Sequence, residues 1–214
     1  MAEDKQPDLR RVTLKNVRLS FTDALREKKR SHPTGPLKFG CNFINETAQP
    51  EFAANERAIK RAIEAAETKE FGEKGVGKIA RTVDDPKRIA YRAGEKFKNK
   101  EGEIYGGYAN NFGLTTKAER RPNLWDRHKR DVEVEDIEDV FQAGFYCDAI
   151  VSFYCTSKEE QGGNGLFASV EAIRSRQTGE TFGAGNNTKA EDFEDLADED
   201  DGIGGEVEDD LLAT

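Results

Sequence analysis

The chain has 214 residues, which suffices for one ordinary folded domain and excludes two large domains with linkers. Hydrophobic residues make up 36% and charged residues 35%, so we expect part of the chain to remain unfolded. The net charge of −9 is unevenly spread: residues 191–214 hold twelve acidic residues and no basic one, whereas residues 1–190 carry a net charge of +3.

Neither secretion nor membrane insertion is indicated. The first residues lack the apolar segment of a signal peptide, and nowhere do 18 apolar residues run together. Cys41, Cys147 and Cys155 are odd in number, form no CxxC pair and lie in or beside apolar stretches, which indicates buried, reduced thiols. We therefore expect a cytoplasmic protein without a membrane partner.

Two strands joined by a basic loop open the predicted fold. In residues 11–21 the apolar positions change parity halfway, so we expect a strand with a bulge near Lys15 and Asn16. Residues 23–36 are rich in Lys, Arg and Pro and predict a polar loop, after which residues 37–44 read as a second strand paired with the first.

The middle of the chain predicts one helix and a long connection. Residues 51–69 carry apolar side chains at helical spacing without Gly or Pro, which predicts a helix. Residues 72–107 lack apolar periodicity, so we expect a long, partly mobile excursion, within which residues 74–100 hold nine basic and three acidic residues. Residues 108–117 predict a strand, and the acidic residues 131–140 predict one short strand or turn.

The strongest strand signal covers residues 143–155, and residues 165–173 are its expected hairpin partner. Alternate positions of this strand are wholly apolar and suit the interior of a barrel: Phe145, Cys147, Ala149, Val151, Phe153 and Cys155. Five or so strands with one helix predict a mainly β domain, a small barrel or sandwich, over residues 1–185. Residues 186–214 are too polar and acidic to build a core, and we expect them to be disordered.

No motif predicts catalysis, a metal or a cofactor. GEKGVGKI (72–79) has the spacing of a phosphate-binding loop, but Ile79 replaces the Ser or Thr that would hold magnesium, and the loop follows a helix instead of a strand. The acidic residues between 131 and 139 lack the glycine of a calcium loop and metal-spaced histidines. His32 and His128 have no evident nucleophile or carboxylate partner.

Basic residues interleaved with aromatics between 87 and 130 favour single-stranded nucleic acid. Cations neutralise phosphates with release of counterions, and aromatic rings stack on unpaired bases for about 1–3 kcal/mol each. The alternative is that Tyr108 and Phe112 belong to the core and the cations to an ordinary solvated surface. Likewise, Tyr146 and Tyr154 could stack on bases or pack under the helix or a loop.

The acidic tail fits the same electrostatic scheme. Tethered near a basic groove, its twelve carboxylates compete with DNA phosphates, and DNA that displaces the tail frees it for protein partners. The alternative is a solubilising tail that has no partner.

Several stretches, in their order, resemble phage-encoded single-stranded-DNA-binding proteins with an OB fold (oligonucleotide-binding barrel) and an acidic C-terminus, of the enterobacterial-phage type formerly described as a domain of unknown function. The stretches are LKFGCNFI before the AIKRAIEAA helix, YANNFGLTTKAERRP, AGFYCDAIVSFYC and GLFASVEAIRSRQTGETFGAG. The resemblance implies a non-catalytic barrel that covers single strands in phage DNA replication, recombination or repair in the bacterial cytoplasm. It also implies a tail that regulates binding and recruits replication or recombination proteins. The tail departs from related ones by ending DDLLAT instead of in an aromatic residue, and Leu211 and Leu212 are the candidates to take its place.

We therefore expect an OB-like barrel that binds single-stranded DNA, and duplex more weakly, with a homodimer compatible with the sequence. The residues expected to contact phosphates are Lys15, Arg18, Lys38, Lys117, Arg120, Arg121, Arg127, Lys129 and Arg130. The residues expected to stack on bases are Tyr105, Tyr108, Phe112, Trp125, Tyr146 and Tyr154. The rival functions are an acidic adaptor or DNA mimic that binds a replication or host-defence protein, and a degenerate nucleotide hydrolase that uses Lys78.

Overall fold

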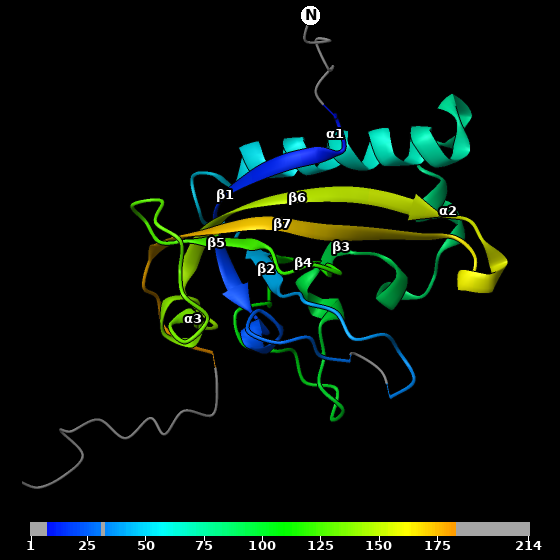
Figure 1. Cartoon of the computed structure of the whole chain (residues 1–214). Helices are drawn as coiled ribbons and strands as arrows, with labels where there is room; N and C mark the ends of the chain where they lie inside the picture. Colours follow the sequence, from blue (N-terminus) through cyan, green and yellow to red (C-terminus); the bar gives the residue numbers. More distant parts are fainter. Residues whose placement is uncertain (1–7, 31–32, 183–214) are drawn as a thin grey trace, which may run out of the picture. The chain divides into compact units, whose positions relative to one another are not determined.

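The computed structural model describes residues 8–30 and 33–182, which form a curved seven-stranded sheet in the order β3-β4-β2-β1-β6-β7-β5 (Figure 1). Every strand pair is antiparallel except β5 with β7. The strands are β1 (Arg11–Ser20), β2 (Asn42–Asn45), β3 (Tyr91–Ala93), β4 (Phe112–Thr115), β5 (Asn123–Trp125), β6 (Tyr146–Thr156) and β7 (Gly165–Gln177).

The sheet closes into the expected barrel next to β3 and β4. Ile89, just before β3, bridges Leu166 of β7, and the backbone N–H of Lys117, just after β4, donates to the carbonyl of Ala168. Closure removes the unpaired edges that an open sheet would expose. The mainly β prediction is therefore confirmed, with short β3 and β5 as additions.

β1 contains the predicted bulge. Its pairing with β6 shifts register between Leu14 and Val17, and Asn16 adopts a left-handed backbone conformation with φ 50°. The extra residue explains why the buried positions change parity along one strand. It also turns the N–H of Asn16 towards the carboxylate of Asp148 on β6, 3.1 Å away.

The helix predicted at residues 51–69 is confirmed as α1 (Phe52–Phe71), which packs along β1 and β6. Its buried face carries Ile59, Ala62 and Ala66. Two short helices, α2 (Lys78–Thr82) and α3 (Ile137–Val140), complete the α structure of the described residues. None of the helices in these residues combines the length and apolar character needed to cross a bilayer.

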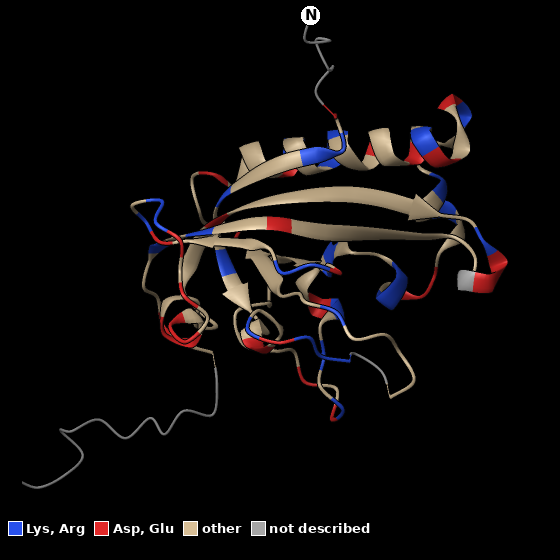
Figure 2. Cartoon of the chain, in the orientation of Figure 1, with Lys and Arg blue, Asp and Glu red and all other residues tan. Residues whose placement is uncertain are grey.

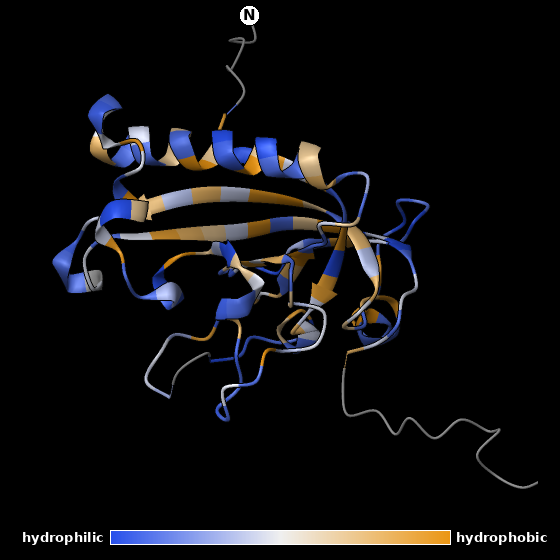
Figure 3. Cartoon of the chain, turned by 180° about the vertical axis from the view of Figure 1, so that it is seen from behind, coloured by the Kyte–Doolittle hydropathy of each residue, from blue (hydrophilic) through white to orange (hydrophobic). Residues whose placement is uncertain are grey.

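The core follows the alternation predicted for the strand at 143–155. Along β6 every second residue from Cys147 to Cys155 is less than 10% exposed, and Figure 3 shows apolar and polar residues alternating along the long strands. Burial of each larger apolar side chain contributes about 1.5–3 kcal/mol to folding. All three cysteines are buried free thiols, as expected.

Two segments hold more regular structure than predicted. Residues 72–107 hold α2, β3 and three turns of 3₁₀ helix, and they bury Ile79, Val83 and Phe97. These apolar anchors escape a search for periodicity because they lie in or directly after elements of only three to five residues. Within the acidic residues 131–140 the structure has the expected turn, at residues 134–136, and the four-residue helix α3 follows it.

The chain divides into two units, Met1–Gly183 and Ala184–Thr214, and every element named above belongs to the first. The tail expected to be disordered, residues 186–214, lies outside the described residues, as does His32.

Candidate nucleic-acid interface

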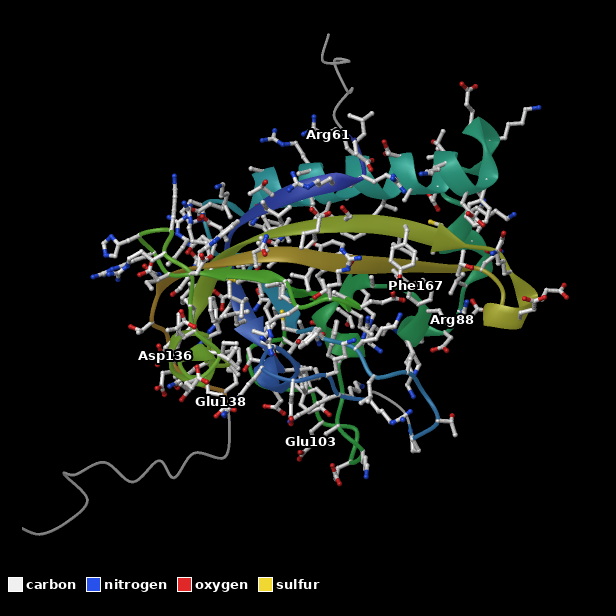
Figure 4. All side chains as sticks on the ribbon, viewed as in Figure 1. Arg61, Arg88, Glu103, Asp136, Glu138 and Phe167 are labelled. Carbon is white, nitrogen blue, oxygen red and sulfur yellow. The ribbon has the colours of Figure 1, made fainter. Side chains whose placement is uncertain are left out.

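Two adjoining hollows on the barrel, of about 530 and 450 Å³, share Lys38, Lys87, Thr115 and Lys117 in their walls and so form one continuous depression, here called the barrel groove. One end is lined by Phe21 and Tyr105, the other by Tyr154 and Phe167. It lies between the β1–β2 loop and the β6–β7 hairpin, and Figure 4 shows Arg88 and Phe167 together beside that hairpin. The guanidinium carbon of Arg88 is 5.6 Å from the ring centroid of Phe167.

The barrel groove is strongly cationic. Its lining includes a single carboxylate, Asp23, which is 4.0 Å from Lys29. Basic residues also mark the loops below the long strands in Figure 2. The cations in the lining are Lys29, Arg30, Lys38, Lys87, Arg88, Arg92, Lys96, Lys98 and Lys117.

Arg92 is held in the groove wall without a counter-ion. It lies on the ring of Phe97, and one terminal nitrogen donates to the carbonyl of Ile89 at 2.7 Å. Its Nε is buried without a hydrogen-bond acceptor, and no carboxylate in residues 8–30 and 33–182 forms an ion pair with it. Burial lowers the pKa of Arg92. A partly desolvated cation without an ion-pair partner favours an anionic ligand.

Lys38 and Lys117 lie close enough to repel each other. Burial lowers the pKa of Lys117, and the charge of Lys38 lowers it further. A bound anion beside the two ammonium groups would relieve this repulsion.

Exposed rings stand at both ends of the groove. Phe21 is 44% exposed and packs edge-on against Tyr105, with ring centroids 4.9 Å apart. Tyr154 is 40% exposed, and its ring centroid is 5.7 Å from that of Phe167. Solvent-accessible aromatic pairs beside cations provide surfaces on which unpaired bases stack.

The predicted contact residues divide into groups. Lys38, Lys117, Tyr105 and Tyr154 meet in the barrel groove. Arg121 lies 5.2 Å over the ring of Phe39 in the groove wall, but it also donates to the carbonyl of Arg26. Six others lie elsewhere. Arg120 is exposed after β4, and Arg127 and Arg130 belong to the loop after β5. Lys15, Lys129 and the half-buried Trp125 line a separate pocket.

Four predicted residues have structural partners instead. The Arg18 guanidinium, 3.1 Å from Glu46, also donates to the carbonyl oxygens of Gly144 and Glu180. The Tyr146 hydroxyl donates to the same Glu46 carboxylate. Tyr108 is fully buried on Phe97, and Phe112 is half-buried and stacked on Tyr91. These contacts tie the barrel together, so we leave these four residues out of the interface.

The structure adds groove residues that the sequence did not single out as contacts. The basic loop at 23–36 and the interleaved basic and aromatic residues between 87 and 130 pointed to the segments that hold the cations, whereas no sequence signal pointed to Phe21 or Phe167 as a contact. The additions are Phe21, Lys29, Arg30, Lys87, Arg88, Arg92, Lys96, Lys98 and Phe167.

The glycine-rich stretch 72–79 is not arranged as a phosphate loop. The Glu67 carboxylate accepts hydrogen bonds from the backbone N–H groups of Gly77 and Ile79, at 2.7 and 2.9 Å. The Lys78 ammonium lies 4.4 Å from the ring centroid of Phe71. A protein carboxylate thus occupies donors that a nucleotide phosphate would need. In the part of the chain described, no group of His, Cys, Asp and Glu could hold a metal ion.

The chain is similar to known proteins along most of its length. The family model described as Enterobacter phage Enc34, ssDNA-binding protein, matches residues 10–203. Putative protein p50 of Acyrthosiphon pisum secondary endosymbiont phage 1 is 28% identical over 188 residues, which cover 87% of this chain and 94% of the relative.

Solved structures show the same fold. The single-stranded DNA-binding protein from bacteriophage Enc34 in complex with ssDNA matches with a TM-score of 0.65 at 14% identity, over 81% of this chain and 90% of that one. The same phage protein in a second structure matches with a TM-score of 0.62 at 15% identity, over 86% and 89% of the two chains.

Proposed function

The chain belongs to the Enc34 single-stranded-DNA-binding protein family, and we propose that it binds single-stranded DNA along the barrel groove. The observation that carries the placement is the lining: it holds nine cations and one carboxylate, and an aromatic pair with at least one exposed ring lies at each end. The cations would take the place of counterions on the phosphates, and the rings would stack on bases. Small barrels of this kind commonly bind oligonucleotides across one face between two loops.

The aromatic ends favour single strands over duplex. Phe21, Tyr105 and Tyr154 can stack only on bases whose faces are accessible, and base pairing and stacking hide those faces inside a duplex. Duplex DNA would contact only the cations of the groove and not its aromatic rings, so it would bind more weakly. The protein would thus cover exposed single strands during phage DNA replication, recombination or repair, without catalysis.

The acidic residues 191–214 supply the second part of the proposal. Their twelve carboxylates are tethered to a domain whose groove attracts phosphates, so they would compete with DNA for the same cations. Bound DNA would release the tail for replication or recombination proteins.

The test is a titration of labelled single-stranded and duplex oligonucleotides, followed by fluorescence anisotropy at about 50 and 200 mM salt. We expect the full-length protein to bind the single strand more tightly and to weaken steeply with salt. A variant that ends at Gly185, checked for folding by circular dichroism, should bind the single strand more tightly than the full chain does. Its affinity should also fall more steeply as the salt concentration rises. If the folded variant does not bind single-stranded oligonucleotides even at the lower salt concentration, the proposal fails, and an acidic adaptor becomes the better hypothesis.

A further inference from the structure

A second pocket, of about 360 Å³, lies on the outer face of the barrel where β5 joins β7, and it shares no lining residue with the barrel groove. We call it the indole pocket because Trp125 forms part of its wall. Ile150 and Ala172 provide apolar lining, and Lys15, Lys129 and Arg174 provide cations. Its volume falls in the range of small-ligand sites.

A single carboxylate organises the charge around this pocket. Asp148, 5% exposed, accepts hydrogen bonds from the guanidinium groups of Arg174 and Arg176 and lies 3.6 Å from the Lys15 ammonium. Burial would raise its pKa, but hydrogen bonds from Arg174, Asn16 and Arg176 outweigh burial and lower it. The ionised Asp148 therefore holds three cations, which leaves an excess of positive charge before Lys129 is counted.

The loop after β5 fixes the opposite side of the pocket. The Trp125 indole N–H donates to the Asp131 carboxylate at 2.9 Å, across a backbone bridge between these two residues. The Asp126 carboxylate accepts from the backbone N–H groups of His128 and Arg130. This short loop turns at Lys129, whose backbone is left-handed with φ 66°, a strained conformation for lysine that is more common at functional sites.

We propose that the indole pocket is a second contact point for single-stranded DNA, in which one base stacks on Trp125 and adjoining phosphates meet Lys15, Lys129 and Arg174. This inference rests on the proposed function and adds a binding position to it. An apolar pocket with an indole wall and a cationic rim matches a planar base attached to an anionic backbone. A paired base in a duplex could not enter it.

The geometry permits one strand to reach both sites. Tyr154 at the end of the barrel groove and Asp148 at the indole pocket are six residues apart on β6, about 20 Å along an extended strand. Between them the outer face carries Glu171, whose carboxylate is paired with Arg11 at 2.7 Å and hydrogen-bonded to Ser152. The carboxylate on this path is thus largely neutralised.

Trp125 is the only tryptophan in the chain, so its fluorescence reports on this pocket directly. We expect a single-stranded oligonucleotide to quench the emission of the full-length protein, whereas the same sequence as duplex leaves it unchanged. Lys129→Glu, in an exposed loop, should weaken the binding seen by quenching about tenfold, because the change replaces a phosphate contact with a repulsion. Lys15→Gln should act in the same direction, and Arg61→Gln on α1 should have no effect.

Anisotropy of a labelled oligonucleotide separates this inference from the proposed function. Arg92→Gln in the barrel groove should weaken anisotropy-detected binding, and excess oligonucleotide should still quench Trp125. Short oligonucleotides that quench as well as long ones would indicate two separate strands, whereas quenching by long ones alone would indicate one continuous strand; either result supports the pocket. Absence of quenching at saturation, equal quenching by duplex, or quenching unchanged in both Lys variants would overturn it. Absence of all binding by anisotropy would instead defeat the proposed function.

Discussion

The guanidinium carbon of Arg92 lies 3.8 Å from the ring centroid of Phe97, while its buried Nε has no acceptor. The ring compensates for part of the hydration that the cation has lost, and the positive charge at the groove wall favours an anion there. The site is therefore arranged before any ligand arrives.

Arg92→Gln should weaken single-strand binding and make the dependence of log K on log salt less steep by about 0.7, because one phosphate contact is lost. Anisotropy titrations across a salt series measure this slope. Arg92→Lys should recover most of the slope because it retains the charge, and Arg61→Gln on α1 should match the wild type (Figure 4). A reduced affinity with an unchanged slope would indicate that Arg92 acts only by shaping the groove.

Lys117→Met should weaken DNA binding without a loss of stability. In the folded protein the pKa of Lys117 is lowered by burial and by Lys38, so the charged amine is disfavoured there relative to the unfolded chain. The methyl thioether removes that penalty and keeps most of the side-chain packing. Thermal unfolding at neutral pH should give a Tm equal to or above that of the wild type. A clear fall in Tm would show that the Lys117 stem or ammonium stabilises the fold.

The sequence predicted the parts of the fold that repeat with a fixed period. The change of parity in β1 identified the bulge, helical spacing identified α1, and alternation identified the buried face of β6. Periodicity could not identify β3 or the anchor Phe97, because these lie in segments too short to show a period.

The site was predicted only in part, for a related reason. Lys38, Lys117, Tyr105 and Tyr154 lie in the groove because β2, β4, β6 and the segment before β4 meet there. Arg18 and Tyr146 were also expected to face DNA, yet Phe182, far along the chain, lies 4.1 Å over the Arg18 guanidinium. Alternation gives the side of the strand from which a residue points, but not which distant segment covers it.

Stability should fall as pH rises above about 9. Burial raises the pKa of Cys41 and of Cys155 from 9.0 to about 12. Between these values the unfolded chain releases thiol protons that the folded protein retains, so higher pH favours unfolding by about 1.4 kcal/mol per pH unit for each thiol. Denaturant titrations at about pH 8 and pH 10 measure the fall.

Cys41→Val provides the matched control for the pH dependence, since it removes one raised pKa and keeps an apolar side chain of similar size. Its free energy of unfolding should fall less steeply between these pH values than that of the wild type. Equal slopes in the two proteins would mean that the Cys41 thiol titrates normally in the fold.

Phe21→Gly should separate binding from stability at the end of the groove. Phe21 has a left-handed backbone with φ 52°, which costs a residue with a side chain about 1–2 kcal/mol, and glycine would relieve that strain. The lost edge contact with Tyr105 is worth about 0.5–1.5 kcal/mol in the opposite direction. The buried part of the ring also contributes to folding, so the free energy of unfolding should fall modestly, by about 1–2 kcal/mol, and the folded variant remains available for binding measurements. Binding of single-stranded DNA should nevertheless weaken about fivefold or more if the ring stacks on a base. Phe21→Tyr keeps the ring and should bind single-stranded DNA like the wild type. Wild-type affinity in Phe21→Gly would show that the Phe21 ring contributes to the structure of the loop and not to DNA binding.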